Sequence, residues 1–373
     1  MTDADTALGL ITIDLNAVAA NYRHLAGIVG PGCRTAAVVK ADAYGLGAVP
    51  VTHRLVDAGC RRFFVATPSE AIGLARAIAD RRTPDSGIEI AVLDGVDGGS
   101  LPSFHAYGLI PVLSAPEQVR LWHEAGGGKP AILQLDSGMS RLGLSLAEIA
   151  PLAASGSFDG YAVDTVMSHL ACADTPAHPM NESQRRNFDA GVAALPETIR
   201  RHAVLSLAAS SGIFLGSGFH YGMVRPGAAL WGLNPTPHTT NPMSQVVGIK
   251  AKIIQVLEID AGRGVGYGAV YVAPGPRRIA TVGVGYADGY PRAAGNRARA
   301  YIGDTRVKLV GRVSMDLTTF DVTGLPASAV GPGGLVELMG PHYGADDLAR
   351  DSDTIGYEVL TRLSRRLHRS YLP

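Results

Sequence analysis

One lysine in this chain stands at the end of an apolar, β-branched run, within residues 37–47. Val38 and Val39 precede Lys40, and Tyr44 and a pair of glycines follow it closely. A buried ammonium is costly unless it is paired, deprotonated or used covalently. A desolvated lysine has a lowered pKa and can attack a carbonyl to form a Schiff base. The simpler alternative is a lysine at a strand end whose ammonium reaches water.

Short β-rich runs alternate with longer amphipathic stretches from residue 35 to residue 233. Eight such runs are found, at residues 35–40, 62–67, 88–93, 109–114, 131–136, 164–170, 204–209 and 224–233. The amphipathic stretches include residues 68–80, 116–125, 146–154 and 182–194. Strands that alternate with helices form a parallel sheet, and eight repeats match the α/β architecture of a TIM-like (β/α)8 barrel. A doubly wound open sheet is the rival, but it needs no eighth repeat.

Several polar groups fall at the carboxyl ends of these predicted strands. Lys40 ends the first strand, His169 lies near the end of the sixth, and Gly227 and Ala228 lie just inside the eighth. Polar loops at residues 136–141 and 210–212 follow the fifth and seventh strands. Barrel enzymes place their catalytic residues at this face and bind phosphate after the last two strands. The shared face favours a catalytic Lys40 over a surface lysine.

The pattern changes after residue 242. Short strands joined by Gly, Asp and Pro turns are expected at residues 246–259, 278–285, 299–302, 305–313, 318–322 and 335–339. They predict a mostly antiparallel β domain. The stretch at 234–243, rich in Pro, Thr and Asn, separates the parts, so a barrel over 1–240 and a β domain over 241–373 are expected. A helix at 355–367 is expected to close the chain, and the run at 11–15 is a candidate to pair with the β domain.

Composition excludes several classes of protein. The chain has 373 residues, 46% hydrophobic and 18% charged, with a formal net charge of zero. This composition is typical of a globular protein. Because the chain has no net positive charge, its charge gives no reason to expect binding to nucleic acid or to an anionic membrane. The acidic amino terminus lacks the basic region of a secretion signal. Three widely spaced cysteines predict neither a disulfide framework nor a metal cluster. A soluble, cytoplasmic protein without a metal is expected.

Together these motifs resemble the alanine racemases, enzymes that use pyridoxal 5'-phosphate and consist of a barrel and a β domain. The resemblance covers essentially the whole chain. It rests on nine segments in the same order as in the family, at residues 38–45, 135–143, 167–171, 209–212, 224–227, 264–268, 284–289, 311–316 and 356–358.

The resemblance implies a role for each matching residue. Lys40 carries the cofactor and is one of two catalytic bases, and Tyr267 is the other. His169 contacts the Tyr267 phenol, and Arg225 contacts His169 and faces the pyridine nitrogen. The groups implied at the cofactor phosphate are Tyr44, Tyr357, Ser210, Ser211, Gly227 and Ala228. The groups implied near the substrate are Arg141, Tyr286, Met315 and Asp316.

The resemblance further implies a homodimer with two shared active sites. Tyr267, Tyr286 and Met315 of the β domain would be supplied to the barrel of the other subunit. The implied reaction is the interconversion of L-alanine and D-alanine, in which two bases serve opposite faces of the cofactor. Most other enzymes with this cofactor place a carboxylate at the pyridine nitrogen, so Arg225 favours a racemase over a decarboxylase.

Three alternatives and three departures from the family remain. The alternatives are a racemase that also accepts serine, a barrel-type decarboxylase, and a cofactor carrier that would be a lone barrel. The departures are Leu46 in place of histidine, Ser314 in place of cysteine, and Gln134 in place of a carbamylated lysine. We expect Gln134 to hydrogen-bond Arg141, with Asp136 completing the partners of that guanidinium.

Overall fold

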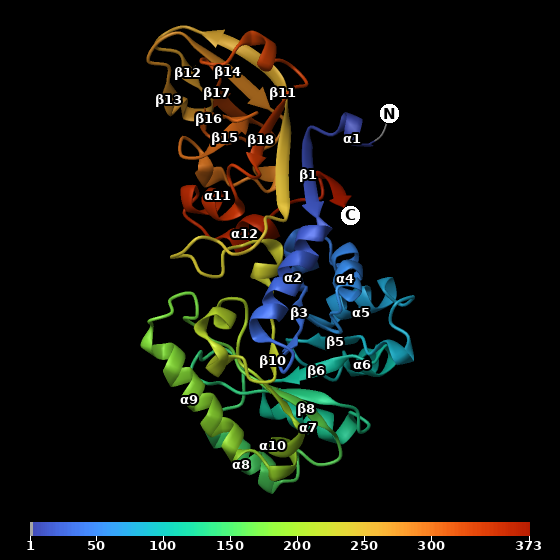
Figure 1. Cartoon of the computed structure of the whole chain (residues 1–373). Helices are drawn as coiled ribbons and strands as arrows, with labels where there is room; N and C mark the ends of the chain where they lie inside the picture. Colours follow the sequence, from blue (N-terminus) through green and yellow to red (C-terminus); the bar gives the residue numbers. More distant parts are fainter. Residues whose placement is uncertain (1–2) are drawn as a thin grey trace.

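The structure, a computed structural model, describes residues 3–373. A parallel barrel lies at one end of the molecule and an antiparallel β domain at the other (Figure 1). The chain starts in the β domain, builds the barrel and then returns. Among the described residues, no helix combines the length and the apolar character needed to cross a bilayer.

Seven parallel strands form the curved sheet of the barrel, in chain order. They are β3 (Ala37–Val38), β4 (Arg62–Val65), β5 (Glu89–Val92), β6 (Ile110–Leu113), β7 (Ala131–Gln134), β8 (Val163–Met167) and β9 (Val204–Ser206). The short β10 (Met223–Val224) pairs with β2 (Arg34–Thr35), and a parallel bridge joins Ala209 to Arg225. These contacts link the last strand to the first. The predicted TIM-like barrel is therefore confirmed.

Helices surround this sheet (Figure 1). They are α2 (Leu15–Val29), α4 (Ala48–Asp57), α5 (Pro68–Ala77), α6 (Leu101–Tyr107), α7 (Pro116–Ala125), α8 (Leu146–Ala154), α9 (Pro179–Ala194) and α10 (Glu197–His202). The α5 helix begins as its sequence predicts, since Thr67 Oγ1 accepts the Glu70 N–H and Pro68 occupies the first turn. Strands β4 to β7 are almost wholly buried, because helices cover one face and barrel side chains the other.

The β domain is one eight-stranded sheet in the order β14-β17-β16-β15-β18-β11-β1-β19, closed by a further pairing of β14 with β11. Its strands are β1 (Gly9–Asp14), β11 (Val247–Ile259), β14 (Arg277–Val282), β15 (Arg299–Ile302), β16 (Thr305–Leu309), β17 (Thr318–Asp321), β18 (Leu335–Met339) and β19 (His368–Leu372). A small hairpin of β12 (Gly264–Val265) and β13 (Tyr271–Val272) lies beside it. Strand β1 pairs with β11, so the expected pairing of the amino-terminal run with the β domain is confirmed.

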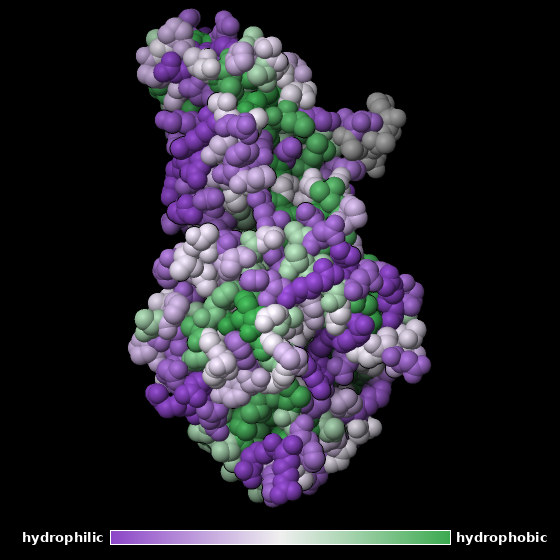
Figure 2. All heavy atoms as spheres, viewed as in Figure 1, coloured by the Kyte–Doolittle hydropathy of each residue, from purple (hydrophilic) through white to green (hydrophobic). Residues whose placement is uncertain are grey.

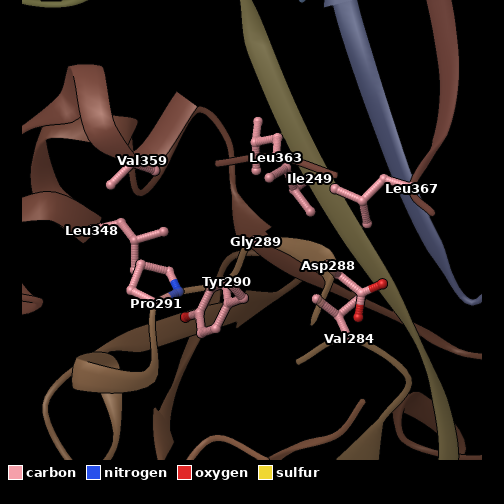
Figure 3. Close-up of a pocket in the computed structure, with 10 residues that line it drawn as sticks. All are labelled: Ile249, Val284, Asp288, Gly289, Tyr290, Pro291, Leu348, Val359, Leu363 and Leu367. Atoms are coloured by element: carbon pink, nitrogen blue, oxygen red, sulfur yellow. The ribbon is translucent and has the colours of Figure 1, made fainter. Parts of the chain in front are cut away.

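The expected closing helix at 355–367 is confirmed at its start but is wrong beyond residue 361. The chain forms α11 (Ala345–Asp351) and α12 (Gly356–Thr361), then turns and ends in β19, which runs parallel to β1. Leu363 and Leu367 of the turn point into an apolar pocket that Ile249 and Val284 also line (Figure 3). Pairing of β19 with β1 gives the last residues of the chain their backbone hydrogen bonds, which favours a strand there.

Candidate active site

Lys40 lies at the carboxyl end of β3, where it begins α3 (Lys40–Gly45). The four residues after it, 41–44, are left-handed, with φ between 52° and 57°. L-amino acids rarely adopt this conformation, so contacts must hold it. On the barrel side, Glu70 Oε1 accepts the Ala41 N–H at 2.9 Å, and the Val39 carbonyl accepts the Ala43 N–H at 2.9 Å. The turn of residues 40–47, called here the Lys40 loop, is therefore fixed by tertiary contacts.

Burial sets the protonation of Lys40 and His169. Burial lowers the pKa of Lys40, and the Arg141 guanidinium lowers that pKa further. The same two effects, with Arg225 and Lys40 as additional cations, lower the pKa of His169 from 6.5 to about 3. The imidazole is therefore neutral near neutral pH. Lys40, Arg141 and Arg225 therefore lie within electrostatic reach of His169.

Arg225 is 3% exposed, and it has no carboxylate partner among residues 3–373. Its guanidinium donates to Ser206 Oγ and to the Ser168 carbonyl, both at 2.5 Å. Burial lowers the pKa of Arg225 to about 10, so this group remains charged at neutral pH. The implied contact with His169 is electrostatic here, because the described hydrogen bonds of Arg225 go to these two serines.

The groups expected at the cofactor phosphate converge from three elements. The rings of Tyr44 and Tyr357, on α3 and α12, lie 6.0 Å apart. Gly227 has no room for a side chain, since a Cβ there would lie 2.5 Å from Tyr44 Oη. Ser210 Oγ accepts the N–H groups of Gly227 and Ala229 at 3.0 and 3.2 Å. Ser210 therefore orders the turn at Gly227, and its expected role at the phosphate stays a prediction.

Three hydroxyls near this turn are free to serve a ligand. Within the part of the chain that is described, no hydrogen bond uses the hydroxyl of Tyr44, Tyr357 or Ser211. Burial raises the pKa of Tyr44, so its phenol keeps its proton and can donate it to an anion. Ser211 opens the 3-10 turn of residues 211–215, beside Ser210, and Ala228 opens the turn of residues 228–231 after Gly227.

The loop before Arg141 differs from the expectation. Asp136 Oδ1 accepts the N–H groups of residues 138, 139 and 140, so this carboxylate caps its own loop and does not pair with Arg141. Gln134 Nε2 donates to the Leu142 carbonyl at 3.1 Å. The expected hydrogen bond from Arg141 to Gln134 is not formed among the described residues. Gln134 instead holds the backbone one residue beyond Arg141.

A buried glutamine that the sequence analysis missed supports His169. Gln184, on α9 and 1% exposed, donates to the His169 carbonyl at 2.9 Å and to Ser137 Oγ at 3.2 Å. Its Oε1 accepts the Ala171 N–H at 2.8 Å. A polar residue in an amphipathic helix gives no sign of this contact, because the contact depends on how α9 packs.

The four expected residues of the β domain make no described hydrogen bond, ion pair or ring contact with this cluster. Tyr267 is 71% exposed on the turn between β12 and β13, at the outer end of the β domain (Figure 1). Tyr286 and Met315 lie on adjacent loops, since the Ser314 carbonyl accepts the Tyr286 N–H. Asp316 pairs with Arg366 at 2.8 Å. No described hydrogen bond, ion pair or ring contact connects any of the four to Lys40 in the same chain.

Comparison with known protein families matches both parts of the chain. The alanine racemase N-terminal domain matches residues 13–235, and the alanine racemase C-terminal domain matches residues 246–371.

Individual relatives match over nearly the full length. A catabolic alanine racemase from Mesorhizobium japonicum is 46% identical over 97% of this chain and 93% of its own length. An alanine racemase from Rhodospirillum rubrum is 46% identical over 100% of this chain and 98% of its own. The solved alanine racemase from Bartonella henselae, which has covalently bound pyridoxal phosphate, superposes with a TM-score of 0.90 at 37% identity, covering 98% of this chain and 100% of that one. Sequence and structure agree that the chain belongs to the alanine racemase family.

Proposed function

We propose that this protein interconverts L-alanine and D-alanine with pyridoxal 5'-phosphate as its cofactor. The observation that carries the proposal is the buried Arg225, which keeps its charge without a carboxylate partner among the described residues, beside a neutral His169 and a half-buried Lys40. Any cofactor or substrate atom that faces the Arg225 guanidinium would therefore lie beside a permanent positive charge. The family relationship supports the same reaction.

The residues of the site fit this cofactor. Lys40 offers an amine whose lowered pKa suits attack on an aldehyde. The hydroxyls of Tyr44, Tyr357 and Ser211 offer donors for a phosphate, and the absent side chain at Gly227 lets the Tyr44 hydroxyl lie close to this turn. When bound, the cofactor draws electrons from the Cα–H bond of an amino acid and so makes its proton removable.

Two bases on opposite faces carry out the proton transfers. The Lys40 amine removes or returns the Cα proton on one face, and the Tyr267 phenol does so on the other. A free tyrosine has a pKa of about 10, so the phenolate needs support at neutral pH. His169 offers a neutral imidazole to the phenol, and Gln184 fixes the His169 backbone.

Arg225 sets the reaction that follows proton removal. Arg225 would face the pyridine nitrogen of the bound cofactor, and its fixed charge would disfavour a proton there. The cofactor would then be a weaker electron sink, which would favour return of the proton to Cα over side reactions. A decarboxylase would need an acid at this position, where this chain has arginine.

We further propose a homodimer in which Tyr267, Tyr286 and Met315 complete the site of the partner subunit. The position of Tyr267 at the outer end of the β domain supports this arrangement (Figure 1). The β domain also exposes apolar side chains, among them Ile254 and Leu257 on β11 and Val272 on β13. Figure 2 shows apolar surface on this domain. Such surface is typical of protein interfaces.

Three further features belong to this proposal. The domain boundary near residue 240 is supported by the family matches, which end at residue 235 and resume at 246. A cytoplasmic location is also part of this proposal. Tyr286, Met315 and Asp316 would surround the substrate together with Arg141, and serine would also be a substrate, since a small pocket rejects one hydroxyl only weakly.

The test is a racemisation assay on the purified protein with added cofactor. L-Alanine should yield D-alanine, detected with a D-amino-acid oxidase, and the reverse reaction should reach the same equal mixture. Formation of ethylamine and carbon dioxide would instead indicate a decarboxylase. Bound cofactor without turnover of either enantiomer would contradict the proposal.

A further inference from the structure

We propose that the last strand of the chain, β19, clamps the Lys40 loop, and that Arg369 and Tyr371 are positioning residues for Lys40. The inference rests on the proposed role of Lys40 as the cofactor-binding lysine. It adds a contribution of the β domain to the active site of its own chain, through residues that touch neither cofactor nor substrate.

The Lys40 loop has a conformation that its own sequence does not favour. Ala41 and Ala43 have φ values of 52° and 53°, where a Cβ crowds the backbone. No glycine occurs among residues 41–44 to relieve this strain. The loop therefore needs partners outside itself, and Glu70 supplies one at its start.

The partners at the other end of the loop come from β19. Arg369 Nη2 donates to the Gly45 carbonyl at 3.0 Å, and Tyr371 Oη donates to the Leu46 carbonyl at 3.0 Å. These are consecutive carbonyls at the end of α3. A guanidinium is rigid and planar, so it fixes the direction of the carbonyl it binds better than an ammonium does.

Close packing against β19 and α12 explains why two positions of the loop are glycine. A Cβ at Gly45 would lie 2.7 Å from the Leu360 carbonyl of α12, and a Cβ at Gly47 would overlap the hydroxyl of Tyr371. Gly45 and Gly47 also have positive φ values, of 82° and 96°. The Lys40 loop thus lies directly against β19 and α12, with no space for side chains between them.

The clamp is anchored in the core of the β domain. The same Arg369 guanidinium donates to the carbonyls of Leu363 and Ser364 at 3.1 and 3.0 Å, so it joins the Lys40 loop to the turn before β19. Leu363 and Leu367 of that turn point into the apolar pocket of the β domain (Figure 3). Strand β19 itself pairs with β1 over five residues. The Lys40 loop therefore cannot move without breaking its hydrogen bonds to β19 or displacing that strand.

The experiment compares three variants of the full-length enzyme. Tyr371→Phe removes only the hydroxyl that binds Leu46, and Arg369→Lys keeps the charge but loses the planar fork. Ser370→Ala is the matched control, because Ser370 is exposed on the same strand. The readouts are amide hydrogen exchange of residues 41–47, the cofactor dissociation constant, and the visible absorbance of the bound cofactor as a function of pH.

The expected result is faster exchange of residues 41–47 and a cofactor dissociation constant raised by about 2-fold to 12-fold in each of the two variants, the worth of one hydrogen bond. The midpoint of the absorbance change with pH should also shift, and kcat should fall more than KM changes. Ser370→Ala should match the wild type in all readouts. In a separate check of the proposed function, borohydride reduction should fix the cofactor to the wild-type enzyme, and protease digestion should then give a peptide that carries the cofactor at Lys40.

Two results would overturn the clamp. The first is that both variants match the wild type in amide hydrogen exchange of residues 41–47, in cofactor dissociation constant and in the pH dependence of the cofactor absorbance. The other is an equal change in Ser370→Ala, which would trace the effect to the strand as a whole. Failure of the proposed function is recognised separately, because the reduced wild-type enzyme would then carry its label at a lysine other than Lys40.

Discussion

The chemistry of single residues here depends on a group of cations that share one buried region. Burial lowers the pKa of His169, and the neighbouring cations Arg225, Arg141 and Lys40 lower it further. The consequence is an imidazole that stays neutral and an amine that is easily deprotonated. Both states are the ones that a two-base proton transfer requires.

The lowered pKa of His169 predicts an acid-sensitive fold. Between its ordinary value of 6.5 and the folded value of about 3, the unfolded chain binds a proton that the folded chain does not. Lower pH in this window therefore favours unfolding, by up to about 1.4 kcal/mol per pH unit. Urea unfolding of the cofactor-free protein at several pH values should show a shallower pH dependence in His169→Gln than in the wild type. Parallel curves would contradict the neutral, buried imidazole.

Gln134 predicts an enzyme that does not respond to carbon dioxide. A glutamine cannot be carbamylated, and its amide binds the Leu142 carbonyl. Activity should be the same in bicarbonate-free buffer and in buffer with added bicarbonate. Gln134→Ala should raise KM for alanine by about 2-fold to 12-fold, because one hydrogen bond that steadies the Arg141 segment is lost. Cofactor affinity, measured by absorbance, should not change. Reversible inactivation on removal of carbon dioxide would show that another group is carbamylated.

At the scale of elements, the phosphate end of the site depends on close approach between α3 and the turn after β10. Gly227→Ala should displace the Tyr44 ring, since its Cβ would lie 2.5 Å from Tyr44 Oη. Loss of a hydrogen bond to a charged phosphate predicts a cofactor dissociation constant raised by about 10-fold to 150-fold. Gly218→Ala is the control, because a Cβ there meets no atom within 4 Å. Equal cofactor affinity in the two variants would exclude this role of Tyr44.

Regular periodicity in the sequence was enough to predict most elements. Helices α7 and α8 and strands β15 and β18 occur at the predicted residues, because amphipathic pattern and turn residues determine such segments locally. The left-handed turn at 41–44 and the strand β19 could not be predicted. Both depend on contacts between distant parts of the chain, such as Arg369 with Gly45. For the same reason, the sequence indicated Lys40 but not Glu70 or Gln184, which hold its surroundings.

At the scale of the whole molecule, one chain separates the two proposed bases. Lys40 lies in the barrel, and Tyr267 lies on an exposed hairpin at the far end of the β domain (Figure 1). Under the proposed function, a site with both bases needs a second chain. We therefore propose that two subunits build each site, with Lys40 from one and Tyr267 from the other.

Mixing two inactive variants tests this claim most directly. Lys40→Ala removes the cofactor-binding amine, and Tyr267→Phe should lower racemisation by about 10²-fold to 10⁴-fold while cofactor remains bound. After subunit exchange, verified by copurification of differently tagged chains, each mixed dimer should contain one site with both bases. Random pairing of equal amounts predicts recovery to about a quarter of wild-type activity. No recovery in verified mixed dimers would contradict the shared site.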